Sequence, residues 1–167
     1  MNGSYVFLLH LIGFGLIAGL LVRSMLLESA FLAAQDWKIK VYTLSLMNSS
    51  FWLGPVAGIL LLLSGIGNIH NRYMDSPEPW YTEGWLVGKI VLFVILVVNG
   101  ATTGRILSLK RFKLAQEMAS GRVSADSAAN VASLSRRLMF FYVVQSILIL
   151  AILWLAVFGG GKHPGQV

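Results

Sequence analysis

The segment from Trp85 to Ile106 reads WLVGKIVLFVILVVNGATTGRI, and its length and apolar character decide the fold. A helix needs about 20 predominantly apolar residues to cross the hydrocarbon core of a bilayer. Three further runs of comparable character occur at residues 4–22, 46–67 and 138–158. None of the four alternates apolar and polar residues as the strands of a membrane barrel do. The sequence therefore predicts an all-α integral membrane protein, a bundle of four transmembrane helices.

The overall composition agrees with this fold class, and we expect residues 1–167 to form a single domain. Hydrophobic residues make up 56% of the chain and charged residues 12%, about half the charged fraction of soluble domains. The first apolar run lacks the basic region of a signal peptide, so we interpret it as a retained helix. The chain has no cysteine, which excludes disulfides, thiolate metal sites and cysteine nucleophiles.

The positive charges are distributed unevenly among the connections. The second connection has only Arg72 beside Asp75, Glu78 and Glu83, whereas the first and third connections are basic. The basic residues of these two connections are Arg23, Lys38, Lys40, Arg105, Lys110, Arg111, Lys113, Arg122, Arg136 and Arg137. By the positive-inside rule both basic connections lie in the cytoplasm and both termini lie outside. We therefore expect a multi-pass protein of a bacterial plasma (inner) membrane, and the net charge of +6 does not indicate a nucleic-acid partner.

Several helices should continue beyond the membrane on the cytoplasmic side. The first keeps its helical character to about Ala34, before a turn at Gln35-Asp36, and the third to Met118. Gly121 is a plausible helix stop, and Ser124 or Asp126 can cap the fourth helix. These extensions predict two helical hairpins that project into the cytoplasm.

Proline and glycine residues suggest local distortions and helix contacts. Pro55 removes a backbone donor within the second span, where we expect a kink. Small residues let helices approach closely in lipid. Pairs spaced by four residues are Gly15 and Gly19, Gly54 and Gly58, and Gly100 and Gly104. We expect these pairs to mark helix contacts, or a flat face for a cofactor.

Two ionisable side chains at similar depth are the first candidates for a functional site. His10 lies five residues inward from Tyr5, and Lys89 lies four residues inward from Trp85. At about 1.5 Å per residue both lie roughly 6–8 Å below the outer interface. Ionisable groups at membrane depth are costly, so each is a candidate functional residue. They could face each other or a shared ligand.

The chemistry of this pair suggests a haem site. Imidazole ligates iron, copper or zinc, and histidine is a usual axial ligand of haem. The ammonium of Lys89 can pair with a propionate or another carboxylate. His70 in the outer loop is the available second histidine ligand, and His163 lies in the C-terminal tail. The competing interpretations are a histidine that only hydrogen-bonds a neighbouring helix and a lysine that reaches the headgroups.

Other polar residues are interpreted as structural. Asn99, Thr102 and Thr103 in the third span, with Gln145 and Ser146 in the fourth, are expected to hydrogen-bond between helices or to line a polar path. Arg23 and Glu28 are five residues apart and are expected to be solvated or bound to headgroups.

The order of these features resembles the membrane-bound protoporphyrinogen oxidases of HemJ type and a wider group of uncharacterised four-helix membrane proteins. The matching stretches are Leu9-His10-Leu11-Ile12-Gly13, a second helix rich in Gly and Pro, Gly84-Trp85-Leu86-Val87-Gly88-Lys89, and the Gly104-Arg105 pair. The resemblance implies that His10 ligates the iron of haem b and that Lys89 is needed for activity. This chain departs from the oxidases at Asn99-Gly100, where they often have a further histidine, and at Arg136-Arg137, where they commonly have Asn-Glu.

Three functions from different classes follow from these observations. The first is a haem b-binding membrane oxidoreductase, with a porphyrinogen or a quinol as reductant. In the second, His10 and Lys89 line a path for transport of, or resistance to, a metal ion or small molecule. The third is a non-catalytic membrane subunit or assembly factor. The bilayer is the expected environment in each case, and a homo-oligomer is compatible with all three.

Overall fold

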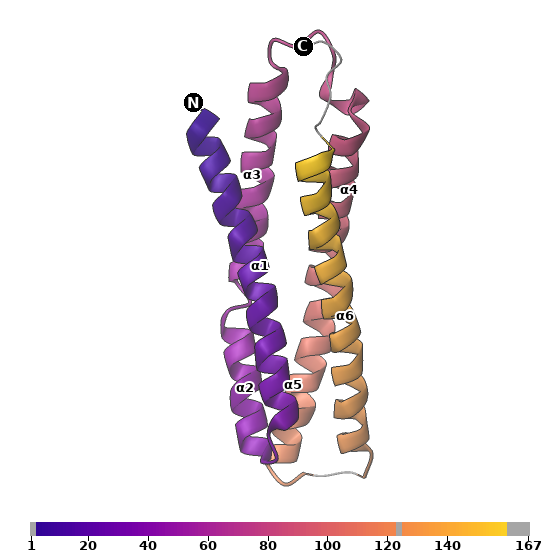
Figure 1. The fold of residues 1–167 in the computed structure, drawn as a ribbon. Coiled ribbons are helices and arrows are strands. Elements are labelled where there is room, and N and C mark those ends of the chain that lie inside the picture. The colour runs from indigo at the N-terminus through magenta and orange to yellow at the C-terminus, as the bar shows by residue number, and fades with distance from the viewer. Residues whose placement is uncertain (1–2, 123–124, 160–167) are drawn as a thin grey trace.

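The structure, a computed structural model, describes residues 3–122 and 125–159, and that part of the chain is helical with short connections (Figure 1). Its elements are α1 (Gly3–Ala33), α2 (Trp37–Ser49), α3 (Leu53–Tyr73), η1 (Trp80–Thr82), α4 (Gly84–Asn99), η2 (Gly100–Gly104), α5 (Arg105–Ala119) and α6 (Ala125–Phe158). Four helical stretches are long and apolar enough to cross a membrane: Ser4–Ala33, Trp37–Tyr73, Gly84–Ala119 and Asp126–Phe158. The predicted all-α class with four candidate spans is confirmed.

The helices form two pairs that converge at one end. In the upper half of Figure 1, α1 runs along α3, and α4 runs along α6. In the lower half, α1, α2, α5 and α6 pack together, with α2 against both α1 and α5, and α6 against α5 and α1. The two predicted hairpins therefore exist, and they are docked against each other.

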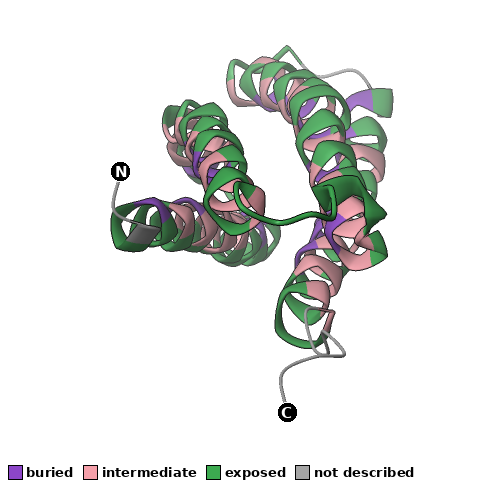
Figure 2. Cartoon of the chain, turned by 90° about the horizontal axis from the view of Figure 1, so that it is seen from above, coloured by how far each residue is buried: buried purple, intermediate pink, exposed green. Residues whose placement is uncertain are grey.

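The lower end contains the main hydrophobic core. Phe31, Leu44, Ala115 and Val131 are almost fully buried and come from α1, α2, α5 and α6. Elsewhere the helices expose most of their apolar side chains (Figure 2). In each candidate span, only 11–17% of the residues in an apolar stretch of 18 residues are buried within the structure. Such surfaces are compatible with contact to a lipid bilayer, because lipid covers apolar side chains that the chain itself leaves uncovered.

The second candidate span is interrupted just before Pro55. Helix α2 ends at Ser49 and α3 begins at Leu53, so Pro55 stands in the first turn of α3. That position tolerates proline, whereas a continuous helix would need its missing N–H to bond the carbonyl of Phe51. The expected distortion is confirmed as a break between two helices.

Most predicted helix ends hold where the structure describes them. Helix α1 ends at Ala33, and the Asp36 carboxylate accepts a hydrogen bond from the Lys38 N–H at 2.8 Å as the cap of α2. After α5, Gly121 has φ +78°, a conformation that glycine adopts without steric cost. Asp126 lies inside the first turn of α6, and Ser124 falls outside the described residues. The connection between α3 and α4 is shorter than predicted, because α3 continues to Tyr73.

Only some of the predicted glycine contacts form. A Cβ on Gly15, Gly19 or Gly54 would meet nothing within 4 Å, so the predicted helix contact is wrong there. A Cβ on Gly104 would lie 2.6 Å from the Phe141 ring, which confirms a close contact at that position. The tight approach of α1 to α3 instead uses Gly13 and Gly67, which the spacing rule missed.

Candidate functional site

His10 lies on the half-buried side of α1 that faces α3. Its Nδ1 is 2.9 Å from the hydroxyl oxygen of Ser64, a buried residue of α3. Gly65 lies beside the ring, since a Cβ there would be 3.7 Å from His10 Cε1. Ser64 was not predicted as the partner of His10, because the register of α1 against α3 depends on packing.

The hydrogen bonds of Ser64 favour one tautomer of His10. The Ser64 hydroxyl donates to the backbone carbonyl of Leu60, at 2.5 Å. With its proton directed there, Ser64 Oγ can accept a hydrogen bond from Nδ1–H of His10. The neutral ring then has an unshared lone pair on Nε2. A histidine oriented in this way, through its other nitrogen, is typical of metal ligands.

Lys89 lies on α4 and extends toward the upper end of the bundle. Its Nζ is 5.3 Å from the centroid of the Trp85 ring, one turn earlier on the same helix. The guanidinium of Arg72, at the end of α3, is also 5.3 Å from that centroid. The indole N–H of Trp85 donates to Glu83 Oε2 at 2.7 Å, which fixes the ring. Arg72 is a member of this site that sequence reasoning treated only as a loop charge.

The two predicted site residues are brought into the same region. The Lys89 ammonium is close enough to the His10 imidazole to interact with it electrostatically, and Arg72 acts on Lys89 in the same way. An imidazole with a free lone pair therefore lies near the Lys89 ammonium, which itself lies near Arg72. This arrangement suits a ligand with a metal or Lewis-acidic centre and negatively charged substituents.

The donor set limits which metals fit. No group of three or more His, Cys, Asp or Glu side chains able to hold a metal ion occurs within residues 3–122 and 125–159. A tetrahedral zinc or copper site built by this chain alone is therefore disfavoured. His70 is exposed near the end of α3, six residues beyond Ser64, or about 9 Å along the helix. His163 lies outside the described residues.

A buried ion pair in the lower half is the largest polar feature that sequence reasoning missed. Glu28 and Arg111 are both fully buried, with 2.5 Å between Glu28 Oε1 and Arg111 Nη1. Arg111 Nη1 also donates to Ser135 Oγ at 3.1 Å, and Nη2 lies 3.8 Å from Met47 Sδ. The guanidinium lies over the Phe31 ring, 4.6 Å from its centroid. The pair thus joins α1, α2, α5 and α6.

The expected solvated state of Glu28 and Arg23 is therefore wrong. Glu28 is paired inside the bundle, and Arg23 donates to the Ser50 hydroxyl and, at 2.9 Å, to the Leu46 carbonyl. The latter contact satisfies a carbonyl that the end of α2 leaves without a helical partner.

Arg111 was interpreted from its residue type alone, as one of the basic residues that indicate the topology. Its position on one stripe with the buried Ala115 and Met118 is the signal that would have revealed it.

The polar residues of the third and fourth spans have mixed roles. Gln145 donates to the carbonyl of Leu96 at 3.2 Å, which confirms an interhelical hydrogen bond. Thr102 and Ser146 instead donate to carbonyls four residues earlier in their own helices. Asn99 and Thr103 line a groove beside the π-helical turn η2.

Comparison of this chain with protein-family models, curated proteins and solved structures gives no match. The class of protein that the fold defines is an all-helical protein with four candidate membrane-spanning helices and a histidine–lysine pair near one end.

Proposed function

We propose that this chain is a haem b-binding membrane oxidoreductase, similar to the HemJ-type protoporphyrinogen oxidases, with His10 as axial ligand of the iron. The observation that carries the proposal is the hydrogen-bond chain from His10 Nδ1 through Ser64 Oγ to the Leu60 carbonyl. It favours the tautomer in which Nδ1 donates to Ser64, and Nε2 would then be the ligating atom. Haem, when bound, would supply one-electron redox chemistry.

Lys89 and Arg72 would hold the charged edge of the cofactor or substrate. Both cations lie over the Trp85 ring, and Lys89 also acts electrostatically on His10. They are suited to bind propionates, which haem and porphyrinogens both carry. We therefore expect activity on a porphyrinogen to depend on Lys89. A quinone or quinol is the alternative redox partner.

The positions of the histidines favour a single histidine ligand for the iron. His70 is exposed, and about 9 Å of helix separates it from the level of Ser64. His10 would therefore be the residue that holds the iron, and the haem would supply redox chemistry toward a substrate or oxidant.

The proposal also specifies the membrane in which the protein lies and its orientation in that membrane. We propose that the four helices are inserted in a bacterial plasma membrane, with both chain termini outside and the lower end of Figure 1 in the cytoplasm. The exposed lysines and arginines gathered near the lower end support this orientation, among them Lys38, Lys110, Lys113, Arg136 and Arg137.

The decisive experiment is the absorption spectrum of protein expressed with ample haem and purified in detergent, oxidised and reduced. Wild-type protein should show a Soret band. His10→Ala should abolish or strongly shift the band while the protein still inserts. Ser64→Ala should weaken haem retention by about 10–100-fold, the usual effect of removing a hydrogen-bond partner of a ligand. Lys89→Ala should keep some haem and lower retention or activity.

His70→Ala and His163→Ala are the matched controls, since each removes a histidine other than His10. An unchanged spectrum in both is expected for a five-coordinate iron, and a spectral change in His70→Ala would make it the second axial ligand. Folded wild-type protein that purifies colourless would refute the haem proposal. Substrate-dependent flux in vesicles would then favour transport, and co-purification with a larger complex would favour a subunit or assembly factor.

A further inference from the structure

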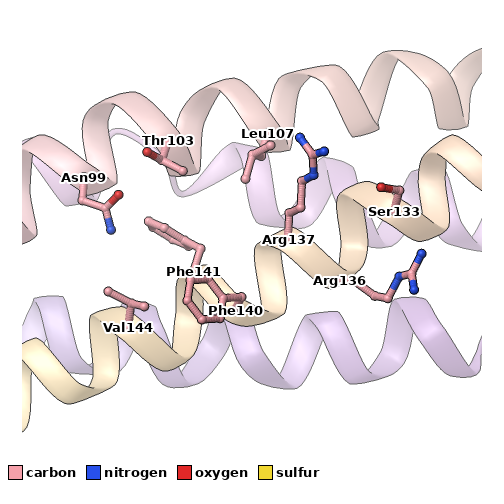
Figure 3. A pocket seen from close by; sticks show the side chains of 9 residues that line it. All are labelled: Asn99, Thr103, Leu107, Ser133, Arg136, Arg137, Phe140, Phe141 and Val144. Carbon is pink, nitrogen blue, oxygen red and sulfur yellow. The ribbon is translucent and has the colours of Figure 1, made fainter.

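An open groove of about 650 Å³ runs between α6 and the helical stretch formed by α4, η2 and α5 (Figure 3). One wall presents Asn99, Thr103 and Leu107, one turn apart along the helix. The opposite wall is α6, from Ser133 to Val144. These twelve residues extend the groove over about 16 Å, which is longer than a phosphate or a single headgroup needs. The groove lies farther along the helical stretch toward the lower end than Lys89 does.

The groove changes from cationic to apolar along its length. Arg136 and Arg137 stand at the end toward the lower part of the bundle, and both are exposed. Phe140, Phe141 and Val144 line the other end. The sequence of α6 therefore places positive charge and aromatic surface within two turns of one another.

A second hollow of about 420 Å³ continues the cationic end. It shares Ser133 and Arg137 with the groove and adds Lys110 and Lys113. Glu117 is the acidic residue in its lining. The two hollows together present four cationic side chains and one carboxylate, so their combined surface is complementary to an anion.

The apolar end depends on Gly104. A Cβ at that position would lie 2.6 Å from the Phe141 ring, so the ring rests directly on the helix backbone. Gln145 Nε2 on α6 donates to the Leu96 carbonyl and joins the same two helical stretches. Packing between the two helices therefore fixes the position of the aromatic surface.

We propose that this groove binds one anionic phospholipid, with its phosphate at Arg136 and Arg137 and an acyl chain along Phe140, Phe141 and Val144. Charge complementarity selects the anion, and the adjacent apolar length selects an amphiphile over free phosphate. A zwitterionic lipid has the same chain, but its choline opposes the cations. The site does not depend on haem binding.

The test is native mass spectrometry of purified full-length protein, delipidated and then incubated with equal amounts of phosphatidylglycerol and phosphatidylcholine of matched chains. Wild-type protein should retain the anionic lipid preferentially. A cationic residue near an anionic surface contributes about fivefold in affinity. Arg136→Gln/Arg137→Gln should therefore reduce the preference by about tenfold or more, and Arg136→Gln alone should give an intermediate value.

Lys38→Gln/Arg122→Gln is the matched control, because it removes two exposed charges near the same end but outside both hollows. It should keep the wild-type preference, and thermal unfolding should show that all variants remain folded. Equal retention of both lipids by wild-type protein overturns the proposal. So does an equal loss in the control, which would indicate a general charge effect, or displacement of phosphatidylglycerol by inorganic phosphate, which would assign the site to a soluble anion.

Discussion

At the scale of single residues, the ion pair of Glu28 and Arg111 shows how charge can be accommodated inside an apolar bundle. Burying two charges is costly, and the attraction between them offsets that cost only with good geometry and further hydrogen bonds. Ser135 supplies one such bond, yet Glu28 Oε2 and Arg111 Nε have no hydrogen-bond partner in the described part of the chain. The pair is therefore better suited to specifying which helices meet than to adding stability.

Removing one partner should be far more harmful than removing both. Glu28→Gln leaves a buried guanidinium without its counter-ion, so the free energy of unfolding should fall by about 3–5 kcal/mol. The apolar replacement Glu28→Leu/Arg111→Met should be near neutral or stabilising by about 1–4 kcal/mol. Reversible denaturant unfolding in detergent micelles measures both.

The exposed Lys38→Met serves as the control for the ion-pair variants and should change stability by less than about 0.5 kcal/mol. If Glu28→Gln behaved like this control, the ion pair would not carry the structural role assigned to it.

At the scale of the elements, the α1–α3 pair depends on a few positions where the helices touch. A Cβ on Gly13 would lie 2.9 Å from Leu61 Cγ and 3.3 Å from the carbonyl oxygen of Ala57. Backbone atoms cannot move aside as a flexible side chain can. This contact also sets the register that places Ser64 opposite His10, so the site depends on how the two helices pack.

Adding one methyl group at Gly13 should therefore separate α1 from α3. Gly13→Ala should lower the thermal unfolding temperature in detergent, with an overpacking cost of about 1–3 kcal/mol. Gly15→Ala, two residues along the same helix, meets nothing within 4 Å. It should leave stability unchanged or raise it by up to about 1 kcal/mol, because alanine is the better helix former. Equal destabilisation by both substitutions would contradict the packing described.

At the scale of the whole molecule, two helical hairpins join around a polar and aromatic centre in the lower half. Helices α1 and α2 form one hairpin, and α5 and α6 form the other. In the upper half the α1–α3 and α4–α6 pairs diverge, and His10 and Lys89 belong to different pairs. A relative movement of the pairs would change the separation of these two residues without breaking the lower core.

The proposed orientation of the molecule in the membrane can be tested with introduced cysteines, because the native chain has none. Ser76→Cys lies in the connection between α3 and α4, and Ser120→Cys follows α5. In intact cells an impermeant thiol reagent should label the first and leave the second unmodified. Labelling of both after lysis is the control for accessibility. The reverse pattern in intact cells would invert the topology.

The sequence by itself determined the helical class, the four candidate spans and most helix ends. Apolar runs of sufficient length, Pro55, Asp36 and Gly121 act through local chemistry, which needs no knowledge of distant partners. The expectation that His10 and Lys89 lie at similar depth also came from counting residues along each helix. Each of these properties depends only on residues within one segment of the chain.

Only the tertiary structure decided which faces meet. Ser64 as the partner of His10, Arg72 beside Lys89, and Glu28 paired with Arg111 across 83 positions all depend on helix rotation and register. The four-residue glycine spacing failed at Gly15 for the same reason. A spacing rule defines a helix face but cannot say whether another helix, a ligand or lipid will cover it, because that depends on packing between segments far apart in the chain.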